Sequence, residues 1–220
     1  MNCPRCQQPV SEGEGYCFAC GFALGFLDIE FGARSAVMER LADAAGVLTR
    51  KERHGIEVKL DRFEEQFPQL FISVYIGEAP AQAGIGEFAF WLLNRAAISE
   101  VDLSRPNDRG ILLVIDPVRR KALLEAGYFI ETILRREDLA GVLERAHLSL
   151  VGERYDVAIR TCVRLLTRLL NRRAKAIHKR AKGHEPEPRL EEDDEWAHIR
   201  FEASAEHLHQ PVGREGDDWR

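Results

Sequence analysis

The sequence predicts an α/β protein, a small three-layer α/β/α sandwich preceded by a four-cysteine zinc ribbon. Two apolar, β-branched runs at 69–77 and 110–115 have the composition of buried strands. Segments with helical spacing of apolar residues lie before, between and after them, which is typical of a small sheet with helices on both faces. Four cysteines near the start form two CxxC motifs, which indicate a separate metal module.

Composition sets the broad class. The chain has 220 residues, of which 45% are hydrophobic, and this is enough to bury a core. Its longest apolar runs, 88–93 and 111–115, are much shorter than the ~20 residues of a membrane helix. The start, MNCPRCQQPV, lacks the pattern of a secretory signal, so we expect a cytoplasmic protein. The formal net charge of −5 excludes a simple polycationic nucleic-acid binder.

The N-terminal cysteines predict a structural zinc site. Cys3, Cys6, Cys17 and Cys20 supply four thiolates on two tight turns, a set that suits tetrahedral Zn²⁺ and leaves no open position for catalysis. Gly21 follows the second turn, where a positive φ is often needed. The alternative is a pair of disulfides, which a reducing cytosol disfavours. The fifth cysteine, Cys162, lies in a helical apolar pattern and is expected in the core.

The next segments are assigned by spacing and capping signals. Residues 21–36 are an apolar, Gly-punctuated connector that either docks the ribbon on the main domain or forms a contact surface. Val37, Leu41, Ala44 and Leu48 recur at helical spacing and predict a helix over 37–48. Thr49 with Glu52 is a capping box, which starts a second helix that ends at Pro68.

The rest of the main domain alternates strands and helices. We expect a strand at 69–77, a deeply packed helix at 87–96, a polar loop at 98–109, a strand at 110–115 and a hairpin partner at 120–126. A helix beginning near Asp138 and a long helix from about 153 to 182 follow. The predicted domains are a zinc ribbon at 1–24, a linker at 25–36, an α/β domain at 37–182 and an acidic disordered tail at 183–220.

The order of several short motifs resembles the TPM-domain family, over the span from about Val37 to Arg168. The matching segments are AGVLTRKE (45–52), VYIGE (74–78), FAFWLLNR (88–95), NDRGILLVID (107–116), Arg119-Arg120, EAGYFIE (125–131), Asp138 and GERYDVAI (152–159). The resemblance implies an α/β/α sandwich. Some members of that family are acid phosphatases, some bind Ca²⁺, and others show no activity. Many relatives are exported and carry a membrane helix, whereas this chain is expected to have neither feature.

Oxygen ligands near the predicted strand ends suggest a second cation site. Ligands of open α/β sheets tend to sit at the carboxyl ends of the strands. The candidates are Glu78, Asn107, Asp108, Asp116, Glu131 and Asp138. Such ligands suit Ca²⁺ or Mg²⁺. Asn107, Asp108 and Asp116 also have a plain structural role as turn formers. Asp138 is a natural helix cap.

The final helix and the tail carry opposite charges. Arg160, Arg164, Arg168 and Arg172 recur every four residues and share one helix face. Residues 184–220 hold 12 acids and 4 arginines, which leaves 27 bases and 24 acids in residues 1–183. The arginine row is either a solvated face or an anion-binding surface. Its candidate partners are nucleic acid, an anionic membrane surface and the acidic tail, which would then compete with an external partner.

These observations favour a cytosolic binding or adaptor protein with an unknown protein partner. No nucleophile motif such as C-x5-R or G-x-S-x-G is present in the sequence. One alternative is a metal-dependent acid-phosphatase-like hydrolase acting through the Asp108 and Asp116 region. The other is a nucleic-acid or anionic-membrane binder that uses the basic helix.

Overall fold

The computed structural model describes residues 3–6, 8, 10, 16–32, 36–81, 84–99 and 107–183. Its elements in chain order are α1 Leu24–Phe31, β1 Val37–Glu39, β2 Leu41–Asp43, α2 Arg50–Gln66, β3 Phe71–Ile76, α3 Ile85–Arg95, β4 Ala97–Ser99, η1 Asn107–Arg109, β5 Gly110–Asp116, β6 Lys121–Ala126, α4 Tyr128–Glu131, α5 Arg136–Val151 and α6 Tyr155–Gly183. Residues 184–220 of the tail predicted at 183–220, and residues 100–106 of the predicted polar loop, lie outside the described residues. Gly183 is the last residue of α6.

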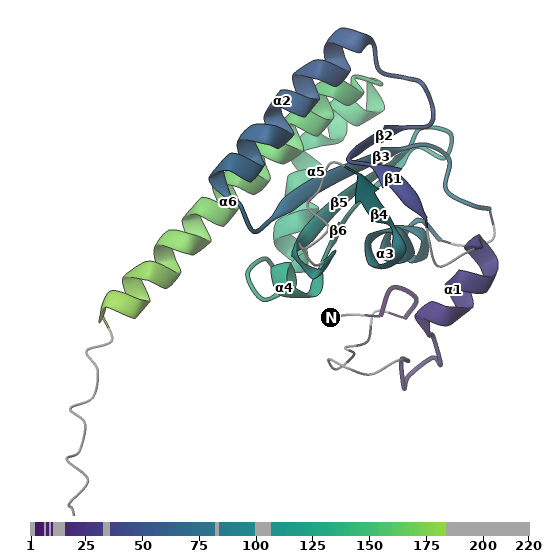
Figure 1. Ribbon diagram of the computed structural model, residues 1–220, viewed down its shortest axis with the longest axis horizontal. Helices are drawn as coiled ribbons and strands as arrows, with labels where there is room; N and C mark the ends of the chain where they lie inside the picture. The colour runs from purple at the N-terminus through teal and green to yellow at the C-terminus, as the bar shows by residue number, and fades with distance from the viewer. Residues whose placement is uncertain are drawn as a thin grey trace, which may run out of the picture. The chain divides into compact units, whose positions relative to one another are not determined.

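A four-stranded sheet with the order β2-β3-β5-β6 forms the centre of the fold (Figure 1). Strands β2, β3 and β5 are parallel, and their register places Leu41 beside Val74 and Val74 beside Leu113. Strand β6 returns antiparallel to β5, with Lys121 opposite Asp116. The strands that the sequence predicts at 69–77, 110–115 and 120–126 are therefore confirmed, including the hairpin.

Alternate residues of the strands face two separate cores. Ile72, Val74 and Ile76 face one side, where α2, α5 and α6 cover the sheet. Phe71 and Leu112 face the other side, where α3 and α1 pack. Because side chains alternate along a strand, runs that are apolar at every position require helices on both faces. The three-layer α/β/α class that the sequence predicts is confirmed.

Local sequence signals explain the helix boundaries. The side chain of Thr49 accepts a hydrogen bond from the Glu52 N–H, and Glu52 in turn accepts one from the Thr49 N–H, so the predicted capping box starts α2. Helix α6 buries Ile159, Cys162 and Leu166 at helical spacing. The predicted core position of Cys162 is confirmed, because its residue is 1% exposed and burial raises its pKa to about 12.

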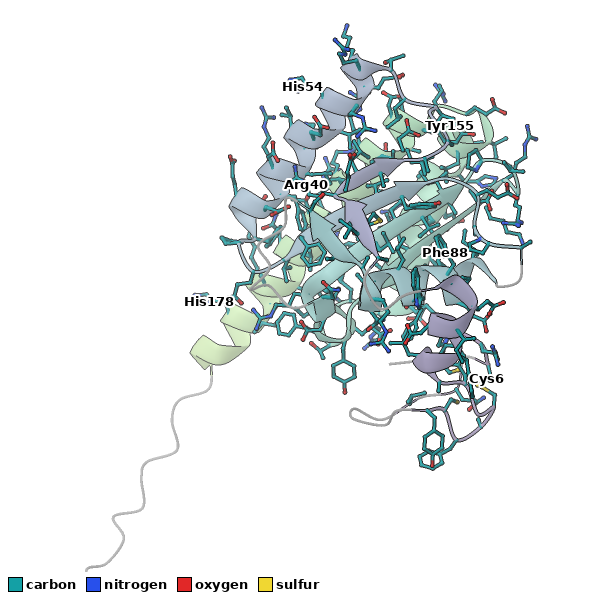
Figure 2. All side chains as sticks on the ribbon, turned by 45° about the vertical axis from the view of Figure 1, so that its right-hand side comes forward. Cys6, Arg40, His54, Phe88, Tyr155 and His178 are labelled. Atoms are coloured by element: carbon teal, nitrogen blue, oxygen red, sulfur yellow. The ribbon has the colours of Figure 1, made fainter. Side chains whose placement is uncertain are left out.

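The helix predicted over 37–48 is wrong. These residues form two short strands instead, in which Val37 pairs with Ala97 of β4 and Leu41 pairs with Val74 of β3. Apolar spacing over so few residues fits either structure, and the open edge of β3 decides in favour of a strand. Arg40, between the two strands, is buried and bonds Asp61 and Glu64 of α2 (Figure 2).

The segment 25–36, predicted as a linker, contains most of helix α1. Its residue Leu27 is fully buried, whereas Phe26 and Ile29 are exposed. Helix α1 is apolar on nearly all sides, so one face can pack against α3 while the other remains at the surface.

Candidate metal centre

Two tight turns present the N-terminal cysteines. The N–H of Cys3 donates to the carbonyl of Gln8 at 2.8 Å, and the N–H of Cys17 donates to that of Phe22 at 2.7 Å. After the second turn, the N–H of Gly21 donates a hydrogen bond to the carbonyl of Cys17 at 2.7 Å. Gly21 has φ +70°, the left-handed value expected from the sequence, which residues with a Cβ rarely adopt.

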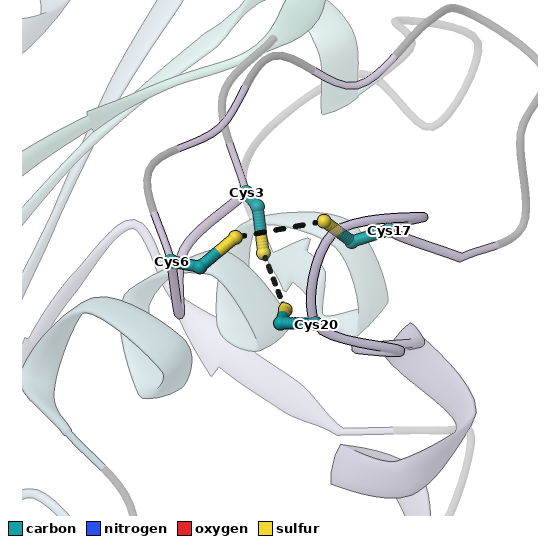
Figure 3. A group of neighbouring side chains, drawn as sticks. All are labelled: Cys3, Cys6, Cys17 and Cys20. Atoms are coloured by element: carbon teal, nitrogen blue, oxygen red, sulfur yellow. Dashed lines mark hydrogen bonds between the residues drawn. The ribbon is translucent and has the colours of Figure 1, made fainter.

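The four sulfur atoms converge on one point (Figure 3). All lie within 4.8 Å of one another, and the Cys3–Cys20 and Cys6–Cys17 pairs are each 3.6 Å apart. A tetrahedral Zn²⁺ with bonds of about 2.3 Å separates its sulfur ligands by about 3.8 Å. A disulfide needs about 2.05 Å, so the arrangement fits a shared ion better than two disulfides.

The surroundings of Cys17 favour its thiolate form. Cys3 and Cys17 are 1% and 2% exposed and belong to the apolar core beside α3. Burial raises the pKa of Cys17, but the backbone N–H groups of Cys20 and Ala19 outweigh this effect and bring its pKa to about 7. The Phe22 N–H lowers the pKa of Cys20, but burial and the neighbouring thiols outweigh it and raise that pKa to about 12. A metal binds thiolate and not thiol, so binding of an ion to this cluster would release protons.

The segment that carries the two cysteine turns packs directly on helix α3. The ring of Phe22 meets that of Phe90 edge to face, with centroids 5.9 Å apart. Arg5 lies over the Phe22 ring and pairs with Glu87 of α3 at 2.6 Å. The predicted docking of this region on the main domain is confirmed by the Phe22 and Arg5 contacts with α3.

Helix α1 strengthens the same contact. The carboxylate of Asp28 accepts hydrogen bonds from the Trp91 indole at 3.0 Å and from Arg95 at 2.7 and 2.9 Å. Phe31 packs against Phe88 and Trp91 with ring centroids 5.7 and 5.1 Å apart. Helix α3 therefore contacts the sheet on one side and the cysteine turns with α1 on the other, which explains why it is apolar on most sides.

The six predicted oxygen ligands are not brought together. Glu78 and Asp116 lie at the carboxyl ends of β3 and β5. Arg119 stands between them, 2.9 Å from Asp116 and 3.5 Å from Glu78. Asp116 also accepts from the N–H groups of Ala79 and Arg119. Its oxygens are thus taken by donors, and a guanidinium already lies beside both carboxylates.

The other predicted ligands lie elsewhere. Asn107 and Asp108 form η1, at the amino end of β5, and Glu131 of α4 lies at that same end of the sheet. Asp138, in the first turn of α5, bonds the Arg135 N–H and pairs with Arg173 at 2.9 Å. The helix N-cap is Arg135 and not Asp138. A single divalent-cation site made from all six residues does not fit this geometry.

The four predicted anion-binding arginines differ in their surroundings. Arg160 is paired with Asp156, one turn earlier on α6. Arg164 and Arg168 line a hollow between α6 and α2, together with Lys59 and Arg62. Arg172 is exposed. The sequence did not identify Lys59 and Arg62 as part of this surface. They are three residues apart and share one face of α2, but only the packing of α2 beside α6 shows that this face lies next to the arginines.

Comparison with known protein families identifies the family of the main domain. The profile of the TPM domain family matches residues 41–169, which is more than half of the chain. The chain belongs to the TPM-domain family. The match starts at β2 and ends within α6, so the cysteine turns and α1 lie outside the TPM domain. No curated protein matches the chain.

Two solved structures are similar to the TPM domain. One is the N-terminal domain of a P. gingivalis protein, which is 17% identical in sequence. The match covers 60% of this chain and 82% of the P. gingivalis chain, with a TM-score of 0.49. The other is the N-terminal domain of the cg2496 protein of Corynebacterium glutamicum, which is 12% identical in sequence. The match covers 61% of this chain and 87% of the cg2496 chain, with a TM-score of 0.46. Among the described residues, no helix combines the length and apolar character needed to cross a bilayer.

Proposed function

We propose that the chain is a binding protein in which a structural zinc ion fixes a ribbon to the TPM domain, and that the TPM domain binds an anionic partner. The convergence of four cysteine sulfurs within 4.8 Å carries the zinc part of this proposal. Four thiolates complete the coordination of zinc, so the ion has no open position for a substrate. Reduced cysteines are consistent with the cytoplasmic location that the sequence predicts.

Zinc also accounts for the folding of the ribbon. Residues 3–23 contribute Cys3, Cys17 and Phe22 to the buried apolar core, and this core is shared with α3. So small a segment cannot bury enough surface to order its own backbone. Metal binding would supply the missing free energy, and the Phe22 and Arg5 contacts would then hold the ordered ribbon against α3.

Metal analysis tests the zinc site. We expect one zinc ion per chain in the purified full-length protein, measured by native mass spectrometry and elemental analysis. Cys3→Ser should lose the ion, whereas Cys162→Ser, which changes a core cysteine outside the cluster, should retain it. Two disulfides and no bound metal would contradict the proposal.

The divided carboxylates support a binding role over hydrolysis. A metal-dependent acid-phosphatase-like hydrolase needs a cation held near its reacting phosphoryl group. In this chain Arg119 pairs with the carboxylates of both Glu78 and Asp116, and Asp108 lies at the other end of β5. We expect no hydrolysis of a generic phosphomonoester with Ca²⁺ or Mg²⁺. Hydrolysis that Asp116→Ala abolishes would instead establish the enzyme alternative.

The anionic partner is inferred from the basic side chains of α6. Arg164 and Arg168 are exposed and face a hollow in which further basic residues lie. Guanidinium groups bind carboxylates and phosphates through paired hydrogen bonds, so such a surface is suited to an anion.

A further inference from the structure

Helices α2 and α6 lie side by side and run in the same direction (Figure 1). Near their beginnings, a Cβ at Gly55 of α2 would lie 3.9 Å from the guanidinium of Arg160 on α6. Near the end of α2, Gln66 donates a hydrogen bond to Asn171 at 2.8 Å. Between these two contacts the helices enclose a hollow of about 250 Å³.

Four basic side chains line this hollow. Lys59 and Arg62 come from α2, and Arg164 and Arg168 come from α6. The apolar residues beneath them, Phe63 and Val163, are 2% and 4% exposed, so little apolar surface is accessible. We call these four cations and the hollow between them the basic seam. Among the described residues, no acidic side chain lines the hollow.

Neighbouring cations outside the basic seam have acidic partners. Arg160 pairs with Asp156, Arg173 pairs with Asp138, and Arg40 pairs with Asp61 and Glu64. Asp61 and Glu64 belong to α2 but are engaged by Arg40 and do not line the seam. In the described part of the chain, no ion pair joins a seam cation to an acid.

This distribution leaves an unfavourable interaction that a bound anion relieves. Like charges one helical turn apart destabilise a helix by a few tenths of a kcal/mol, and a second row across the seam adds to the repulsion. Arg164 and Arg168 are about 6 Å apart along the axis of α6, at 1.5 Å per residue. A ligand with repeated negative charges can therefore contact successive residues of both rows.

We propose that the basic seam binds the phosphate backbone of double-stranded nucleic acid, independently of base sequence. This inference rests on the anion-binding role proposed above and names its ligand. Single-strand binders stack bases on exposed aromatic side chains, and Phe63, the aromatic residue of the seam, is buried. Membrane-surface helices insert large apolar residues, which the seam does not expose. The seam offers four cations beside the polar residues Gln66 and Thr167. Cationic and polar side chains of this kind make sequence-independent contacts with the phosphate backbone.

Binding should depend strongly on salt. Each neutralised phosphate contributes about 0.9 to the slope of log affinity against log salt on duplex DNA, so four contacts predict a slope of about −3.6. Between about 50 and 200 mM salt the affinity should therefore fall about a hundredfold. The probe is a fluorescently labelled duplex of about 20 base pairs and random sequence, made as DNA and as RNA. Its anisotropy is measured with the full-length, zinc-loaded protein.

Paired substitutions test the seam itself. The Arg164→Ala/Arg168→Ala and Lys59→Ala/Arg62→Ala variants should each weaken binding at low salt and reduce the slope by about 2. Over the same salt range their affinity should then fall only about tenfold. The control is Arg50→Ala/Arg145→Ala, which removes two exposed arginines outside the seam and should change neither quantity. Circular dichroism and zinc content confirm that each variant is folded.

Other anions separate this inference from the broader proposal. Polyglutamate and vesicles with roughly 30% phosphatidylserine are tested in parallel. No duplex binding at low salt, or binding that the seam variants leave unchanged, would overturn the nucleic-acid assignment. If polyglutamate or vesicles bind through the seam and the duplexes do not, the anion-binding role stands and the nucleic-acid ligand is wrong. If none of these anions binds, both fail.

Discussion

The carboxylate of Asp116 lies 2.9 Å from the guanidinium of Arg119, across the turn that joins β5 to β6. Asp116 is 1% exposed and also accepts hydrogen bonds from the N–H groups of Ala79 and Arg119. One buried carboxylate thus connects the end of β5, its following turn and the loop after β3. This arrangement explains why an acid ends a strand that is otherwise apolar.

Replacing this carboxylate should destabilise the fold. Asp116→Asn puts an amide group where donors now meet an oxygen, and it should cost about 1–3 kcal/mol of unfolding free energy near neutral pH. Chemical denaturation measures the change. Asp108→Asn, at an exposed predicted ligand position, is the control and should shift stability by less than about 0.5 kcal/mol. Equal losses in the two variants would contradict the structural role of Asp116.

The same substitution should alter the response to acid. Burial raises the pKa of Asp116, but hydrogen bonds from the Arg119 and Ala79 N–H groups and the charge of Arg119 hold it below its ordinary value of 3.8. A lowered pKa stabilises the fold above pH 3.8, and this contribution is lost as pH falls through the folded-state value. The stability gap between the native chain and Asp116→Asn should therefore be full at about pH 6 and narrower at about pH 3.

Asp28 should control how firmly the ribbon and α1 are held. Asp28→Ala removes the acceptor for the buried indole of Trp91 and for the half-buried guanidinium of Arg95. We expect amide hydrogens of 27–31 to exchange at least about tenfold faster, a change that corresponds to about 1.4 kcal/mol or more. Amides of β3 and β5 should keep their protection, because they belong to the central sheet.

Glu30→Ala supplies the matched control for Asp28→Ala. Glu30 lies on the same helix but is exposed, so its removal should leave exchange unchanged. A uniform loss of protection across α1 and the sheet in Asp28→Ala would show that the ribbon, α1 and the TPM domain unfold as one unit.

Signals confined to a few neighbouring residues were predictable from the sequence. The CxxC spacing, Gly21 and the Thr49–Glu52 capping box depend on local geometry, and each is seen in the structure. Strands β3 and β5 were predictable because their apolar runs must be buried on both faces. Even Asn107 and Asp108 could have been excluded from the carboxyl edge, since they precede β5 rather than follow it.

Features that depend on a distant neighbour were not predictable. Strands β1 and β2 exist because β4 and β3 lie beside them, and no property of residues 37–43 alone distinguishes them from a helix. Lys59 and Arg62 resemble any solvated helix face until α6 lies alongside. Arg119 separates Glu78 and Asp116 only after the hairpin forms, so the sequence could not show that their charges are neutralised.

Glu125 should make the stability of the fold depend on pH near neutrality. It lies on β6 and lines a hollow of about 340 Å³ with Glu131 of α4 and Arg136 of α5. Burial, followed by the negative charge of Glu131, raises its pKa to about 7, although Arg136 opposes the shift. The folded chain therefore holds a proton that the unfolded chain releases above its ordinary pKa of 4.5.

The sign of the effect follows from this difference. The favourable contribution of the protonated carboxyl is complete below pH 4.5 and is lost as the pH rises to about 7. Glu125→Gln keeps the shape of the protonated acid without its titration. We expect the variant to match the native chain in thermal stability at about pH 4 and to exceed it at about pH 8. Glu65→Gln, at an exposed position on α2, should show no such divergence. Parallel stability curves for the native chain and Glu125→Gln across this pH range would show that Glu125 ionises as freely in the folded chain as in the unfolded one.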